Sequence, residues 1–100
     1  MNKNLLMVID NQLNPGKYNR EQLRQNASEA AAIYAEYAKA DYAIGAGYVD
    51  YAAANAAAAC AAADIAAIEH WIDRYFNNSK ENKQDYINEI NKDKKWTKTY

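Results

Sequence analysis

The residues that could perform chemistry are few and scattered. His70 is the only histidine, and Glu69 and Asp73 lie near it, four residues apart on one face of a predicted helix. A metal site needs more ligands than these, and no His-Glu-x-x-His spacing is present. Cys60 is the only cysteine and has alanine neighbours, without the cationic groups that activate a thiol. We therefore expect a protein that is not an enzyme and has no cofactor or metal.

The elements that would position any site are organised around an alanine-rich middle. All 21 alanines lie between Ala27 and Ala67, and alanine has the highest intrinsic helix propensity. Asn19 and Gln22 have the spacing of a capping box, which predicts that a helix starts there. The polar run at residues 77–79 predicts its end. We expect an all-α protein with one long Ala-rich helix over 19–77, and because charges interrupt every apolar window, no membrane span.

A line of apolar positions runs along this middle with alternating spacings of three and four residues. It extends from Ala30 to Tyr75, and all five isoleucines between Ile33 and Ile72 lie on it. A seven-residue repeat of this kind is typical of coiled coils and helix bundles. Since an extended helix cannot bury its faces alone, we expect packing against the chain's own ends, bundle or coiled-coil-like self-association into a homo-oligomer, or both. A self-assembling structural helical protein is therefore an alternative function.

Two glycines leave an alternative open. Gly45 and Gly47 could end one helix and let the chain turn back, which would give a helical hairpin broken at Gly45–Gly47. The apolar line crosses both glycines without a shift of phase, and a turn has no reason to preserve that phase. The pattern favours the continuous helix, with the hairpin as the alternative.

Short helices are expected on either side, within a single helical domain over 1–100. The N-terminal segment, 1–18, has an apolar run that predicts a helix over 5–13 capped by Asn4, or a short strand, followed by a turn at 14–16. A C-terminal helix over 82–95, capped by Asn82, precedes a tail at 96–100. We expect the core at the large side chains of the second half: Ile65, Ile68, Trp71, Ile72, Tyr75 and Phe76. If the Ala-rich segment is a hairpin, the N-terminal segment would complete the same core with Leu5, Leu6 and Ile9.

Acidic and tyrosine side chains flank the apolar line at fixed positions. The acids that flank the line on one side are separated by 7, 14 and 14 residues, and no Lys or Arg opposes them there. One reading is a solvated acidic edge. The other is a partner-binding surface for a protein with a basic surface, because tyrosine is enriched at interfaces. On the second reading the partner-binding residues are Glu29, Tyr34, Glu36, Tyr37, Asp41, Tyr48 and Asp50.

Charge is unevenly distributed around the net value of -1. Residues 27–76 contain two cations and seven acids, which gives -5, whereas 1–26 and 77–100 are each +2. The basic ends could fold back on the middle or order an assembly. Near the C-terminus four lysines surround Trp96, so nucleic-acid binding through this tail is a further hypothesis.

The Ala/Tyr-rich middle, with Trp71-Ile72-Asp73-Arg74-Tyr75-Phe76 and Glu81-Asn82-Lys83-Gln84-Asp85-Tyr86-Ile87, resembles small accessory proteins of tailed bacteriophages. The resemblance covers about residues 27–90, and it implies a non-enzymatic protein that inhibits a host or anti-phage defence factor by binding. No functional residues can be carried over from it. With no signal peptide and a single cysteine, the cytoplasm of the bacterial host cell is the expected location.

Overall fold

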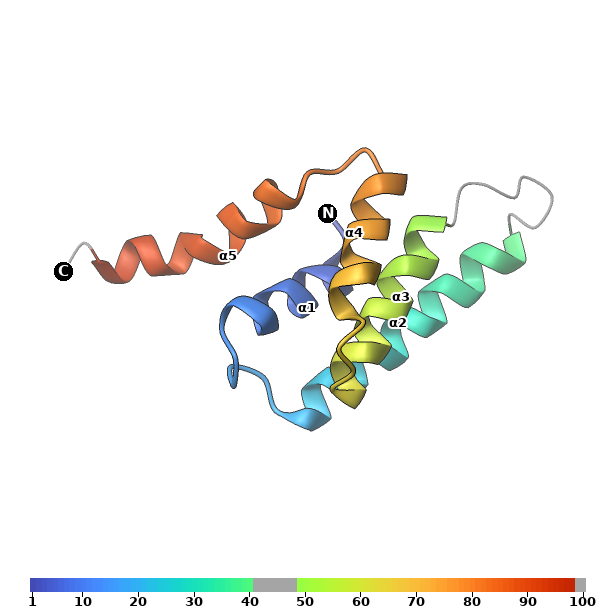
Figure 1. Ribbon diagram of the computed structural model, residues 1–100, viewed down its shortest axis with the longest axis horizontal. Coiled ribbons are helices and arrows are strands. Elements are labelled where there is room, and N and C mark those ends of the chain that lie inside the picture. The colour runs from blue at the N-terminus through green and yellow to red at the C-terminus, as the bar shows by residue number, and fades with distance from the viewer. Residues whose placement is uncertain (41–48, 99–100) are drawn as a thin grey trace.

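The computed structural model describes the backbone of residues 1–40 and 49–98, and the side chains of residues 1–36 and 51–92 (Figure 1). The described residues form helices α1 (Lys3–Leu13), α2 (Arg20–Ala40), α3 (Val49–Ala63), α4 (Ile68–Asn78) and α5 (Lys83–Lys98). The all-α fold class is confirmed. None of the helices in these ranges is both long and apolar enough to span a membrane.

The expected single helix over 19–77 is wrong, because this segment is divided into α2, α3 and α4. α2 and α3 lie side by side and antiparallel, and α4 packs along α3 (Figure 1). This arrangement corresponds to the hairpin alternative. The chain reverses direction between the end of α2 at Ala40 and the start of α3 at Val49, and Gly45 and Gly47 lie outside the described residues. One extended helix would leave its apolar faces in water, whereas three packed helices bury these faces against one another. Tertiary packing of this kind supplies most of the stability of helices in proteins.

A second break, at the end of α3, was not predicted. Asp64 adopts a left-handed backbone conformation with φ of 56°. The Ile65 N–H donates to the Cys60 carbonyl at 2.9 Å, and the Asp64 N–H donates to the Ala61 carbonyl at 3.3 Å. These two bonds form a Schellman motif, which satisfies carbonyls that a helix end leaves free. Glycine usually occupies the left-handed position, and because Asp64 stands there instead, no local signal predicted this turn.

The alanines place α3 at the centre of the molecule, where it contacts α1, α2 and α4. Among residues 51–63 of this helix, whose side chains the structure describes, the buried side chains are all methyl groups: Ala53, Ala54, Ala57, Ala58 and Ala61. Side chains of this size let neighbouring helices approach closely, and alanine loses no side-chain entropy on packing. The close approach of three helices to α3 therefore explains why these five buried positions are alanine.

The larger core side chains come from the other helices. Ile72 and Tyr75 of α4 and Tyr86 of α5 are buried with Leu5 and other residues of α1, as the sequence predicted for α4 and α1. The rings of Phe76 and Tyr86 meet edge to face at 5.2 Å, a favourable aromatic geometry. Ile65, which was expected in this core, is 50 % exposed because the turn at Asp64 carries it outward.

Local signals in the sequence set several helix ends correctly. The Gln22 N–H donates to the Asn19 side chain at 2.8 Å, and the Asn19 N–H donates to the Gln22 side chain at 2.9 Å, which confirms the capping box. The Asn82 side chain accepts from the Gln84 N–H at 2.7 Å at the start of α5. The predicted turn at 14–16 is present, with Gly16 at φ of 88°.

The predicted cap of α1 is wrong. Asn2, not Asn4, is the N-cap, and its side chain accepts from the Leu5 N–H at 2.9 Å. Asn4 is buried instead, and its amide bonds to Asn26 of α2. Asn4 lies on the inward face of α1, where it can reach a partner on α2, and Asn2 is the residue placed to cap the first turn.

Candidate functional site

A cleft of about 370 Å³ opens where α1, α2, α3 and α4 come together. The start of α1 supplies one wall, and α2 and α3 supply another. Tyr75 of α4 and Glu81, from the segment between α4 and α5, complete it. The side chains that line this cleft are Met1, Asn2, Lys3, Asn4, Glu29, Ile33, Tyr51, Tyr75 and Glu81.

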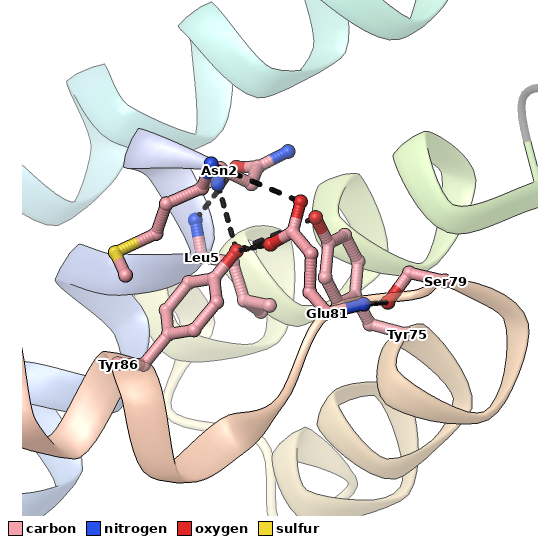
Figure 2. A network of polar contacts seen from close by, with 7 residues as sticks. Asn2, Leu5, Tyr75, Ser79, Glu81 and Tyr86 are labelled. Carbon is pink, nitrogen blue, oxygen red and sulfur yellow. Dashed lines mark hydrogen bonds and ion pairs between the residues drawn. The ribbon is translucent and has the colours of Figure 1, made fainter.

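A hydrogen-bond network centred on the Tyr86 hydroxyl joins three residues that line one end of the cleft, Asn2, Tyr75 and Glu81 (Figure 2). The Asn2 N–H donates to the Tyr86 hydroxyl oxygen at 2.7 Å. The Tyr86 hydroxyl donates its proton to the Glu81 carboxylate, and the Tyr75 and Tyr86 hydroxyl oxygens lie 3.4 Å apart. Because Tyr86 has a single hydroxyl proton, the proton shared by the two tyrosines comes from Tyr75. One oxygen atom thus joins α1, α4 and α5.

Both phenols are held in the neutral form. Burial raises the pKa of Tyr86 to about 12, and the hydrogen bond with Glu81 contributes to the rise. Burial also raises the pKa of Tyr75 above its ordinary value, and its hydrogen bond with Tyr86 adds to the effect. Both shifts move the phenols further from titration near neutral pH. The network therefore joins the groups at this end of the cleft through neutral phenols.

The open side of the cleft combines charge with apolar surface. Glu29 is exposed and makes no hydrogen bond or ion pair with the described residues. Ile33, one turn further along α2, is 40 % exposed, which is high for an isoleucine. Glu36 is exposed on the same face of α2, one heptad from Glu29. A carboxylate next to an apolar surface suits a long cationic side chain, because lysine and arginine have apolar stems and charged heads.

The predicted partner-binding residues fall into three groups. Glu29 and Glu36 are exposed on α2, and Tyr34 is half-buried on a different side of the same helix. Tyr37 belongs to α2 and Asp50 to α3, but their side chains lie outside the described residues, and so do Asp41 and Tyr48 entirely. The structure therefore brings Glu29 and Glu36 together and places Tyr34 apart from them.

Sequence reasoning missed most of the cleft. Lys3, Glu81 and the Tyr86 network come from segments distant in sequence, and only Glu29 among the lining residues was a predicted site residue. One signal in the sequence was available. Glu81 and Tyr86 lie five residues apart across the start of a predicted helix, and each has a polar group that needs a hydrogen-bond partner when it is buried.

The residues with potential chemistry remain dispersed in the part of the chain that the structure describes. No group of three or more His, Cys, Asp or Glu in those residues could hold a metal ion. His70 is exposed, with its ring edge-on to Trp71 at 5.0 Å, and Cys60 is half-buried. No protein-family model, curated protein or solved structure matches the chain.

Proposed function

We propose that the chain is a non-enzymatic protein-binding module that takes a basic segment of another protein. The observation that carries the proposal is the pair of exposed carboxylates Glu29 and Glu36, which we call the acidic edge. They lie seven residues apart, about 10 Å along α2, and neither has an ion-pair partner among the described residues. Ile33 lies between them, half exposed beside the cleft.

The chemistry of the edge defines the kind of partner. Exposed charges at an interface contribute most to encounter rate and to the choice of partner, and apolar side chains in a pocket contribute most to affinity. An arginine or lysine would place its stem on Ile33 and its charged head at Glu29 or Glu36. The excess of acids in residues 27–76 adds a longer-range attraction for a basic surface.

The resemblance to accessory proteins of tailed bacteriophages supplies the biological class of this proposal. A phage protein of this kind would act in the cytoplasm of the bacterial host, as an inhibitor that occupies a basic surface of a host or anti-phage defence factor. Inhibition by occupancy requires an accessible surface and no reactive group, and the exposed carboxylates of Glu29 and Glu36 meet that requirement.

The test is capture of a partner from bacterial lysate after nuclease treatment, with three forms of the chain compared. These are the wild type, the edge variant Glu29→Lys/Glu36→Lys, and a control variant Asp85→Lys/Glu89→Lys. The control reverses the same number of charges at exposed positions on α5. We expect one protein in stoichiometric amount with the wild type and the control, and its loss with the edge variant.

Equal capture by the edge variant would reject this surface, and no capture by any form would reject the binding function. Circular dichroism of each variant should show wild-type helix content, since all four positions are exposed.

A second candidate is nucleic-acid binding, favoured by the direction of α5. This helix leaves the bundle and extends away from α2 and α3 (Figure 1). Its last turns contain Lys92, Lys94, Lys95 and Lys98 in sequence. Replacement of these lysines by glutamine should abolish salt-sensitive binding of single-stranded DNA. An unchanged dependence on salt would reject this candidate.

A further inference from the structure

A second concave surface lies on the other side of α2. It is a groove of about 550 Å³ between the first half of α2 and the end of α3. Arg20 and Arg24 stand at its border, and its other lining residues are small: Ala27, Ser28, Ala59, Ala62 and Ala63. We call it the basic groove. Both arginines are exposed, and neither makes an ion pair with a described residue.

The basic groove and the acidic edge belong to different sides of the same helix. At 100° per residue, Arg20 and Arg24 point about 150° away from Glu29 and Glu36 around the axis of α2. Glu29 and Ile33 line the cleft, and Arg20 and Arg24 line the groove. On α2, therefore, two arginines on one side and two carboxylates on the other make no ion pair with the described residues.

We infer that the occupant of the basic groove is the acidic edge of a second copy of this chain. Arg20 and Arg24 of one copy pair with Glu29 and Glu36 of the next. The alanine floor admits the incoming helix because no large side chain blocks it, and helix axes can approach to about 8 Å over small residues. A neutral or basic helix would leave the four charges unpaired, so the complementary charge selects this occupant.

The contact joins two different surfaces, so it is heterologous. A dimer therefore keeps a free edge on one copy and a free groove on the other, and such contacts continue into open chains or close into rings. Self-association also covers Glu29 and Glu36, the same residues proposed to bind a partner. Partner binding and self-association therefore compete for the acidic edge, whereas only self-association also requires the basic groove.

The test uses two neutralised variants, the groove variant Arg20→Gln/Arg24→Gln and the edge variant Glu29→Gln/Glu36→Gln. In sedimentation at low salt, the average mass of the wild type should rise with protein concentration beyond the mass of a dimer. At high salt the average mass should fall again, because salt screens the ion pairs. Two to four exposed ion pairs predict that each variant alone self-associates roughly tenfold more weakly. A control variant, Glu69→Gln/Asp73→Gln on α4, should associate as the wild type does.

Mixing the two variants separates this arrangement from others. The groove variant keeps an intact edge and the edge variant keeps an intact groove, so an equimolar mixture should recover wild-type affinity but stop at one-to-one dimers. A wild type that is monomeric up to about 1 mM would overturn the inference, because even weak specific contacts associate at that concentration. Mixtures no tighter than the separate variants would also overturn it.

The groove variant also separates self-association from the binding of a protein partner. The groove variant leaves Glu29 and Glu36 untouched, so it should lose self-association and still capture the protein partner from lysate. If phosphate-containing polymers bind the wild type and not the groove variant, while sedimentation shows no self-association, the groove takes phosphate and the second-copy assignment is wrong.

Discussion

Asn4 of α1 and Asn26 of α2 are bonded to each other in both directions. The Asn4 side-chain amide donates to the Asn26 side-chain oxygen at 2.9 Å, and the Asn26 amide donates to the Asn4 backbone carbonyl at 3.0 Å. Both residues are buried, with exposures of 6 % and 4 %. Each amide therefore depends on the other, because water cannot replace either partner.

The Asn26→Ala substitution should lower the free energy of unfolding by about 1–3 kcal/mol, the cost of a buried amide left without its partner. Urea unfolding monitored by circular dichroism measures the change. Asn77→Ala, at an exposed position of α4, is the matched control and should change stability by less than about 0.5 kcal/mol. A similar loss in both variants would show that the pair has no special role.

Asp10 should make stability sensitive to acid. Burial opposes ionisation of its carboxyl, but hydrogen bonds from Lys17, Tyr18 and Asn14 outweigh burial, so the pKa lies below the ordinary value of 3.8. A lowered pKa in the folded state gives stability that is present above pH 3.8 and is lost as the pH falls through the folded-state value.

Asp10→Asn should therefore be about 1–3 kcal/mol less stable than the wild type at pH 7. The difference should shrink when the pH falls below 3.8, because the wild-type carboxyl then becomes neutral too. Urea midpoints of both proteins across this range measure it, with Asp85→Asn as the exposed control. A difference that is independent of pH would contradict the ionic origin.

Tyr86 should make stability sensitive to alkali. Its pKa is raised from 10.0 to about 12, so the folded state favours the neutral phenol. The resulting stabilisation is complete below pH 10 and is lost as the pH rises toward 12. Urea midpoints should fall over this interval, and the absorbance of ionised tyrosine should include a component that titrates only on unfolding.

Tyr86→Phe removes this titration along with the hydroxyl. We expect a loss of about 1–3 kcal/mol at pH 7, because the Asn2 N–H and the Tyr75 hydroxyl lose their acceptor, and a weaker dependence on pH above 10. Tyr75 retains its own raised pKa, so some dependence should remain. A pH profile identical to that of the wild type would contradict the assignment to Tyr86.

The turn at Asp64 should respond to side-chain shape. Its φ of 56° strains a residue with a Cβ atom, and a β-branched residue most of all. Asp64→Gly should be stable to within about 1 kcal/mol of the wild type or slightly above it, and Asp64→Val should be about 1–2 kcal/mol less stable. Thermal unfolding of the pair measures the difference. Equal stabilities would mean that the chain does not adopt this conformation in solution.

Features encoded within a few residues could be predicted from the sequence. The capping box of Asn19 and Gln22, the turn at 14–16 and the start of α5 after Asn82 each depend on contacts between close neighbours. The large side chains of α4 and α1 were also assigned correctly to the core, because apolar bulk is scarce elsewhere.

Features that depend on distant contacts or on an unusual backbone could not be predicted. The apolar line keeps its spacing of three and four residues across Asp64, although α3 ends there. Ala61 before the turn and Ile72 after it both face the core, but from separate helices, so the spacing did not reveal the break. The Asn4–Asn26 pair joins residues that are 22 positions apart in the sequence, and the Asn2–Tyr86 bond joins residues that are 84 positions apart. No local pattern links such residues, so the cleft that they help to form remained hidden.

The buried alanines of α3 set how closely α2 can approach but do not, by themselves, fix its position along α3. Methyl groups give a nearly smooth contact, whereas Leu or Ile in their place would interlock as knobs in holes. The buried amide pair that ties Asn26 to α1 supplies a fixed point on α2 from outside this contact, and it therefore opposes a slide of α2 along α3.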